Sequence, residues 1–141
     1  MNMVQFRMSK INTEQFAILS ETPPVGDIKL NTILEVKFSV ELHSIAITLK
    51  TSFEFQEKSF LLLIISCEFE VLQTDWDSLK KDGKIIIPKY ILETFAVQTI
   101  GTARGIMHCK TEGTPFNHFI IPPINATKLI NGDLTIDTYR K

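Results

Sequence analysis

IAITLKTSFEF (45–55) is the stretch that decides the fold. Apolar and polar residues alternate along it, so that successive side chains point to opposite sides of an extended backbone. The odd positions fall on one face and are apolar except for one threonine: Ile45, Ile47, Leu49, Thr51, Phe53 and Phe55. A period of two over this length predicts a strand of an antiparallel sheet, with one buried face and one solvated face.

Similar patterns flank this stretch on both sides. LEVKFSVEL (34–42) alternates with its apolar set at even positions, so the phase slips at His43-Ser44 and predicts a turn or bulge there. SFLLLIISCEFEVL (59–72) follows a polar corner and is apolar on both faces in its first half, which is typical of a central or doubly covered strand. VQFRM (4–8) and FAIL (16–19) predict a first strand with a polar middle. We therefore expect four antiparallel strands over about residues 3–73, with Phe38, Phe53, Phe55 and Phe69 at core-facing positions.

The pattern changes after Trp76. DSLKKDGK (77–84) predicts a solvated connection, and Pro88 suits the first turn of a long helix over 88–104. Gly105 suits a left-handed cap at its end. Apolar residues recur at spacings of three and four and cover more than one side of this helix. We therefore expect a homo-oligomer, with one side of the helix on the sheet and another at an interface formed by Ile91, Phe95 and Ile100.

The rest of the chain completes the expected architecture. A proline-rich loop leads to a short second helix over 126–131, with Asn125 as its N-cap. The final residues, DLTIDTYRK, are ambiguous between an edge strand and a C-terminal tail over 132–141. Strands followed by helices, without βαβ alternation, predict an α+β fold in a single domain over 1–141.

Composition limits the classes of function. The chain has 141 residues, a net charge of −1 and a sequence pI near 6.3, so nothing favours binding to nucleic acid or to an anionic membrane. The longest apolar run, FLLLII (60–65), is too short to span a bilayer, and no signal-like apolar segment is present. Two cysteines make no disulfide framework, so we expect reduced thiols and a cytoplasmic protein.

RGIMHCKTEGTPFNHFIIPPIN (104–125) is the densest stretch of reactive side chains. A Cys-His nucleophile pair needs the thiolate close to an imidazole, but the side chains of adjacent His108 and Cys109 tend to diverge. His118 reaches Cys109 only through a specific loop fold. A zinc site usually takes three or four ligands, and no C-x-x-C is present. The residues favour a structural loop with no metal, no cofactor and no enzymatic activity, with a small hydrolase using Cys109 and His118 as the alternative.

The same loop is unusually apolar. Phe116, Phe119 and Ile121 lie beside three prolines, at positions 115, 122 and 123, which restrict the backbone. Either these side chains pack onto the sheet, or they wall a groove for an extended apolar peptide, or both. We predict that they contribute to a client-binding surface through hydrophobic contact.

The chain resembles SecB, the bacterial export chaperone that holds preproteins unfolded. The residues that carry the resemblance are Arg104-Gly105 at the helix end, then FNHFIIPPIN (116–125), and the step Cys67-Glu68 late in the last strand. In SecB a similar loop runs from Phe-Pro through an apolar stretch to Pro-Val-Asn before the last helix. The order of elements agrees over residues 4–131, and the insert HCKTEGTP (108–115) lengthens the loop.

The resemblance implies a non-enzymatic holdase that binds unfolded or nascent polypeptide for Sec-dependent export. It further implies docking of the SecA motor on a sheet surface containing Glu68, and a homotetramer, with a dimer as the alternative. A SecB-like chaperone with another client, such as a labile antitoxin protein, is the second alternative.

Overall fold

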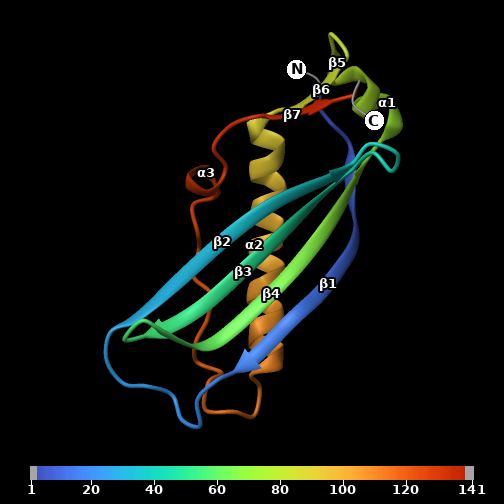
Figure 1. Cartoon of the computed structure of the whole chain (residues 1–141). Helices are drawn as coiled ribbons and strands as arrows, with labels where there is room; N and C mark the ends of the chain where they lie inside the picture. The colour runs from blue at the N-terminus through green and yellow to red at the C-terminus, as the bar shows by residue number, and fades with distance from the viewer. Residues whose placement is uncertain (1–2, 139–141) are drawn as a thin grey trace.

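The computed structural model describes residues 3–138, and its main layer is a four-stranded antiparallel sheet. The strands are β1 (Phe6–Ile18), β2 (Ile28–Ser39), β3 (Ser44–Phe55) and β4 (Lys58–Val71). Their order is β1-β4-β3-β2, so β3 and β4 are central and β1 and β2 are edges. Figure 1 shows the long helix α2 (Lys89–Lys110) against one face of this sheet. The opposite face, called the outer face below, has no element over it in the part of the chain that is described. The expected α+β class and four-stranded sheet are confirmed.

The apolar residues of β2 lie at even positions and those of β3 at odd positions, and the strand register places both sets on the same face of the sheet. Leu34 of β2 pairs with Leu49 of β3, which pairs in turn with Ile65 of β4. Even-numbered residues of β2 therefore share the α2-facing side with odd-numbered residues of β3 and β4. The predicted turn at the phase slip is confirmed: His43 has a φ of 41°, and its ring Nδ1 lies 2.5 Å from the carbonyl oxygen of Val71. This hydrogen bond ties the turn between β2 and β3 to the end of β4.

The two edges of the sheet differ in regularity. β1 is one continuous strand, and its register against β4 shifts between Met8 and Lys10 and again between Thr13 and Gln15. Such shifts mark bulges, which interrupt the row of backbone groups that an edge presents. β2 pairs with β3 from one end to the other without a shift. β2 is therefore the regular edge and β1 the bulged one.

The connection expected to be solvated contains secondary structure. It includes the end of the short helix α1 (Gln73–Ser78) and β5 (Lys80–Lys81), and β6 (Lys84–Ile87) follows. β7 (Leu134–Asp137) pairs with β6, so the three form a second, small sheet of order β5-β6-β7. The edge-strand alternative therefore holds for 134–137, while residues 139–141 of the expected tail lie outside the described part of the chain.

Helix α2 is longer than the sequence predicted. It continues to Lys110, so Gly105 lies inside it and the expectation of a glycine cap is wrong. Pro88 takes the N-cap position in an extended conformation and has no side-chain donor or acceptor to offer. Asp133, which precedes β7, supplies the missing acceptor: its Oδ1 receives the backbone N–H of Lys89 at 2.7 Å. The small sheet and the helix N-terminus are thereby joined.

The inner side of α2 is the core of the subunit itself. Ile91, Phe95 and Ile100 are exposed by only 4%, 0% and 3%, and the ring of Phe95 stacks on that of Phe69 at 4.2 Å between centroids. The expectation that these three side chains form an interface between copies of the chain is therefore wrong. The helix looked apolar on several sides because its own sheet covers a wide arc of it.

Residues 111–134 return along the helix side of the sheet. In Figure 1 this segment, orange to red, runs beside α2 on the side of β2. It contains α3 (Ala126–Leu129), which is shorter than expected. The predicted cap at Asn125 is confirmed, because its Oδ1 accepts the N–H of Thr127 at 3.0 Å.

Candidate functional site

The reactive stretch after α2 acts as a C-terminal cap of the helix. The hydroxyl of Thr111 donates to the carbonyl oxygen of Met107 at 2.8 Å, and the amide of Asn117 donates to that of His108 at 2.9 Å. The same Asn117 amide reaches the Thr111 hydroxyl at 3.1 Å. The last carbonyls of a helix have no partner within it, so these side chains satisfy groups that would otherwise be unpaired. This explains how the helix ends without its predicted glycine.

The cysteine and histidines of this stretch are not gathered into a site. Cys109 is a free, exposed thiol, and among residues 3–138 no hydrogen bond joins it to a histidine. Nδ1 of His108 faces the Asn117 amide at 3.5 Å, while His118 lies against Phe119 with ring centroids 4.2 Å apart. Within the same residues, no three His, Cys, Asp or Glu side chains are placed to hold a metal ion.

The second thiol, Cys67, lies on the α2-facing side of β4 and is fully buried. Burial raises its pKa above the ordinary value, opposed in part by hydrogen bonds from the side chains of Thr99 and Thr102 on α2. A thiol held in its protonated form by burial is a poor nucleophile. Cys67 therefore packs as a small core residue.

An aromatic cluster fixes the loop that was expected to bind clients. Phe116 and Phe119 from the loop meet Phe53 of β3 and Phe60 of β4, with centroids of 5.5 Å for Phe53–Phe119 and 5.0 Å for Phe60–Phe119. Phe116 is only 2% exposed and Ile121 is fully buried. For these two residues the structure corrects the expectation of an open surface, because both belong to the core. Phe119 is half-buried at the margin of the cluster.

The guanidinium of Arg104 holds the loop where it leaves the cluster. Its Nε donates to the carbonyl oxygen of Ile121 at 2.5 Å, and its Nη2 donates to that of Pro122 at 3.1 Å. A proline-rich segment has few backbone donors of its own, so a side chain that satisfies two successive carbonyls fixes its course. Arg104, the first residue of the Arg-Gly step, thus anchors the loop on the helix.

An open apolar row lies instead along β2. α2 packs over β3 and β4, and the α2-facing side chains of β2 keep part of their surface exposed. Leu34 and Val36 line a groove of about 260 Å³, whose other wall is Leu92 of α2 with Leu129 and Leu134 of the returning segment. We call this the β2 groove.

The row continues past the groove to the end of β2 and into the turn that follows it. Phe38 is 48% exposed, and Val40 and Leu42 follow at 41% and 61%. The expectation that Phe38 is a core residue is therefore wrong. Its alternation with polar residues gave the correct face of the sheet, but that face is open here because α2 does not extend over the end of β2.

Glu68 lies on the outer face of the sheet. Its register partners are Lys10 on β1 and Ala46 on β3, and the next glutamate, Glu70, forms an ion pair with Arg7 at 3.2 Å. Both glutamates therefore stand beside a basic residue of β1. The outer face carries mixed charge at this end of the sheet and is not an acidic surface.

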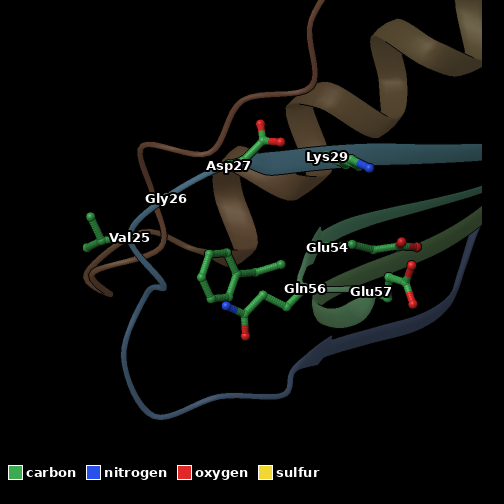
Figure 2. A pocket seen from close by; sticks show the side chains of 8 residues that line it. Val25, Gly26, Asp27, Lys29, Glu54, Gln56 and Glu57 are labelled. Carbon is green, nitrogen blue, oxygen red and sulfur yellow. The ribbon is translucent and has the colours of Figure 1, made fainter.

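A further cavity, of about 500 Å³, lies at the far end of the sheet where β2 starts and the β3–β4 turn is formed (Figure 2). Carboxylates of Asp27, Glu54 and Glu57 surround it together with Lys29. Figure 2 shows these side chains spread around the opening, and Asp27 points away from the two glutamates. They do not converge on a point that would hold a ligand.

Comparisons of the chain with family models, with curated proteins and with solved structures found no match. No helix within residues 3–138 has the length and apolar character needed to cross a bilayer.

Proposed function

We propose that the protein is a non-enzymatic holdase that binds unfolded polypeptide along β2. The observation that carries this proposal is the half-open apolar row of Leu34, Val36 and Phe38, which runs beside the β2 groove on a regular edge strand. An exposed apolar row on an edge strand is a liability for a protein that binds nothing, because it invites aggregation. For a chaperone the same row is the working surface.

Two kinds of contact contribute to client affinity. Burial of aliphatic and aromatic client side chains contributes about 25 cal/mol per Å² of apolar surface, less the cost of ordering the client. Backbone pairing with β2 adds hydrogen bonds that do not depend on client sequence. The edge of β2 that points away from β3 has no backbone partner among the described residues. Because β2 pairs with β3 without a register shift, this free edge offers a continuous row of donors and acceptors. Because neither kind of contact requires a particular client sequence, a site of this kind binds many different clients.

The assembly and partners follow the resemblance to SecB. We propose a homo-oligomer, with a tetramer favoured, in the cytoplasm, and preproteins for Sec-dependent export as clients, with an antitoxin-like client as the alternative. Since Ile91, Phe95 and Ile100 are core, an interface on α2 would use its solvent side, where Tyr90 and Val97 are each 56% exposed. Docking of a SecA-like motor would use the outer face at Glu68, where affinity depends on the neighbouring lysine and arginine as well.

The test replaces Phe38 by alanine and measures client affinity and melting temperature on the same sample. Truncating a contact aromatic typically costs on the order of 2 kcal/mol, about thirtyfold in affinity. Because about half of the Phe38 surface is exposed, we expect the melting temperature to change little. The matched control is Val25→Ala, at a side chain that is 92% exposed and remote from the groove. Unchanged client affinity in Phe38→Ala would exclude β2 as the binding surface.

A further inference from the structure

The edge strand β2 presents two different rows of side chains. On the α2-facing side lie Leu34, Val36 and Phe38, which keep part of their surface exposed. Glu35 and Lys37 alternate with them on the outer face, and both are exposed. Figure 1 shows β2 at one edge of the sheet, so a strand added there continues both faces. Its side chains would alternate between the same two faces and meet an apolar row on one and charges on the other.

The two charges in this stretch have no charged partner directly across on the neighbouring strand. Glu35 lies opposite Thr48 of β3, and Lys37 lies opposite Ala46. Within residues 3–138 neither of the two charged side chains forms an ion pair. Residues directly opposite each other on adjacent strands are close enough for opposite charges to attract and for like charges to repel. A strand on the free edge of β2 is therefore placed to pair with both charges.

The α2-facing row selects apolar residues in the added strand. Leu34 and Val36 border the β2 groove, and Leu92 and Leu129 form part of its opposite wall. An apolar client side chain next to Val36 has this groove to enter. A charged side chain placed there gives up its hydration against a largely apolar wall, which is unfavourable. The structure thus favours an apolar residue at every second position of the client.

We propose, resting on the proposed function, that the preferred client segments pair antiparallel with β2 and read, from their N-terminus, apolar, acidic, apolar, basic, apolar. In this pairing the acidic residue lies across Lys37 and the basic residue across Glu35, while the apolar residues extend the α2-facing row. Antiparallel pairing is slightly more stable per residue than parallel pairing, and this sets the direction. The client class is the amphipathic strand of a sheet protein that has not yet folded. A segment with apolar residues every three or four positions does not match.

A second copy of the chain is the competing occupant, because β2 itself reads in this order, LEVKF at 34–38. Two-fold pairing of two β2 strands in this register is centred on Val36 and covers only residues 33–39, because β2 ends at Ser39. Residues 28–32 of each copy then lie beyond the end of the other strand. So short an overlap buries less than the roughly 1,200 Å² of a stable interface. A client chain has no such symmetry and continues along the whole edge, which favours the client.

Binding of three labelled peptides of identical composition, measured by fluorescence anisotropy, tests the pattern. The first is Thr-Leu-Glu-Ile-Lys-Leu-Thr with blocked termini, the second exchanges its glutamate and lysine, and the third is Thr-Leu-Ile-Leu-Glu-Lys-Thr. The wild type should bind the first about threefold more tightly than the second, which matches the charges only when it runs parallel to β2. It should bind the third at least about tenfold more weakly than the first, because the third places a lysine on the α2-facing side.

A double charge reversal of the protein shows whether these two residues carry the preference. Glu35→Lys combined with Lys37→Glu should reverse it, so that the second peptide binds about threefold more tightly than the first. Both side chains are exposed, so the melting temperature should change little. The matched control reverses the ion pair between β1 and β4, Arg7→Glu combined with Glu70→Arg, and should leave the preference unchanged.

The proposal is overturned if the wild type binds none of the peptides or all three equally, if it prefers the second, or if the double variant keeps the wild-type preference. Any of these results leaves the proposed function standing as long as an unfolded client still binds and loses affinity in Phe38→Ala. A client affinity that Phe38→Ala leaves unchanged overturns the proposed function, and this inference with it. Sedimentation of Glu35→Lys without peptide examines the competing occupant: a lower mass than the wild type would assign the stretch to a second copy and overturn the proposal.

Discussion

β2 and β3 pair residue by residue along their whole length, yet they are buried to very different depths. Ile45, Ile47 and Leu49 of β3 are fully buried, whereas their partners on β2, Phe38, Val36 and Leu34, retain exposed surface. Both strands show the same alternation in sequence. The difference arises because α2 is narrower than the sheet and lies over β3 and β4. Alternation identifies the face of a strand, while the position of the helix determines how much of that face is covered.

The largest expected effect compares two leucines that are register partners. Leu49→Ala should lower the free energy of unfolding by about 3 kcal/mol, because it leaves a cavity in a close-packed region. Leu34→Ala should cost about 1 kcal/mol, because its side chain is already partly exposed and water fills the space. Chemical denaturation of both variants gives the two values. Equal losses would mean that β2 is as well covered as β3, and would remove the basis for a groove there.

The next effect concerns what holds α2 in place over the central strands. Asp133→Ala removes the acceptor of the Lys89 N–H at the start of the helix, and we expect a loss of about 1 kcal/mol. Asp133→Asn keeps an oxygen acceptor and should lose less. Urea denaturation of the two variants is the measurement. If alanine and asparagine are equally harmless, the helix start is fixed by packing alone.

A smaller effect concerns Cys67 on the α2-facing side of β4, which makes the free energy of unfolding depend on pH. The raised pKa of Cys67 means that the folded protein keeps the thiol proton in a pH range where the unfolded chain has lost it. The contribution is fully present below the unfolded thiol pKa of about 8.5 and is lost as the pH rises through the higher pKa of the folded state. We expect the free energy of unfolding to fall with pH above about 8.5, and to fall less steeply in Cys67→Ala. Parallel curves for the two proteins would show that this thiol is not desolvated.

The strands and their faces could be predicted from the sequence, because a period of two and the phase slip at His43 are local signals. The long helix was predicted as well, but its end was not. The cost of Gly105 in a helix, about 1 kcal/mol, is offset by burial of Met107 and by the cap from Thr111 and Asn117. These partners become visible only when the loop is folded.

The parts of the site that were missed depend on contacts between distant segments. Phe116 joins rings from β3 and β4 and becomes core, which its loop sequence does not reveal. Strand β7 has only four residues and exists because β6, far away in sequence, is beside it. Phe38 was assigned to the core for the converse reason: its pattern is that of a buried strand, and only the position of α2 shows that it is open. The groove on β2 therefore could not be located from sequence alone.

Amide hydrogen exchange with and without an unfolded client tests the central claim most directly, because the sheet has two edges that serve as test and control. The account predicts slower exchange on client binding in β2 (28–39) and in the facing segment 129–134, with no change in the bulged edge β1. Protection confined to β1, or to the outer face around Ile64, with β2 unchanged, would contradict it.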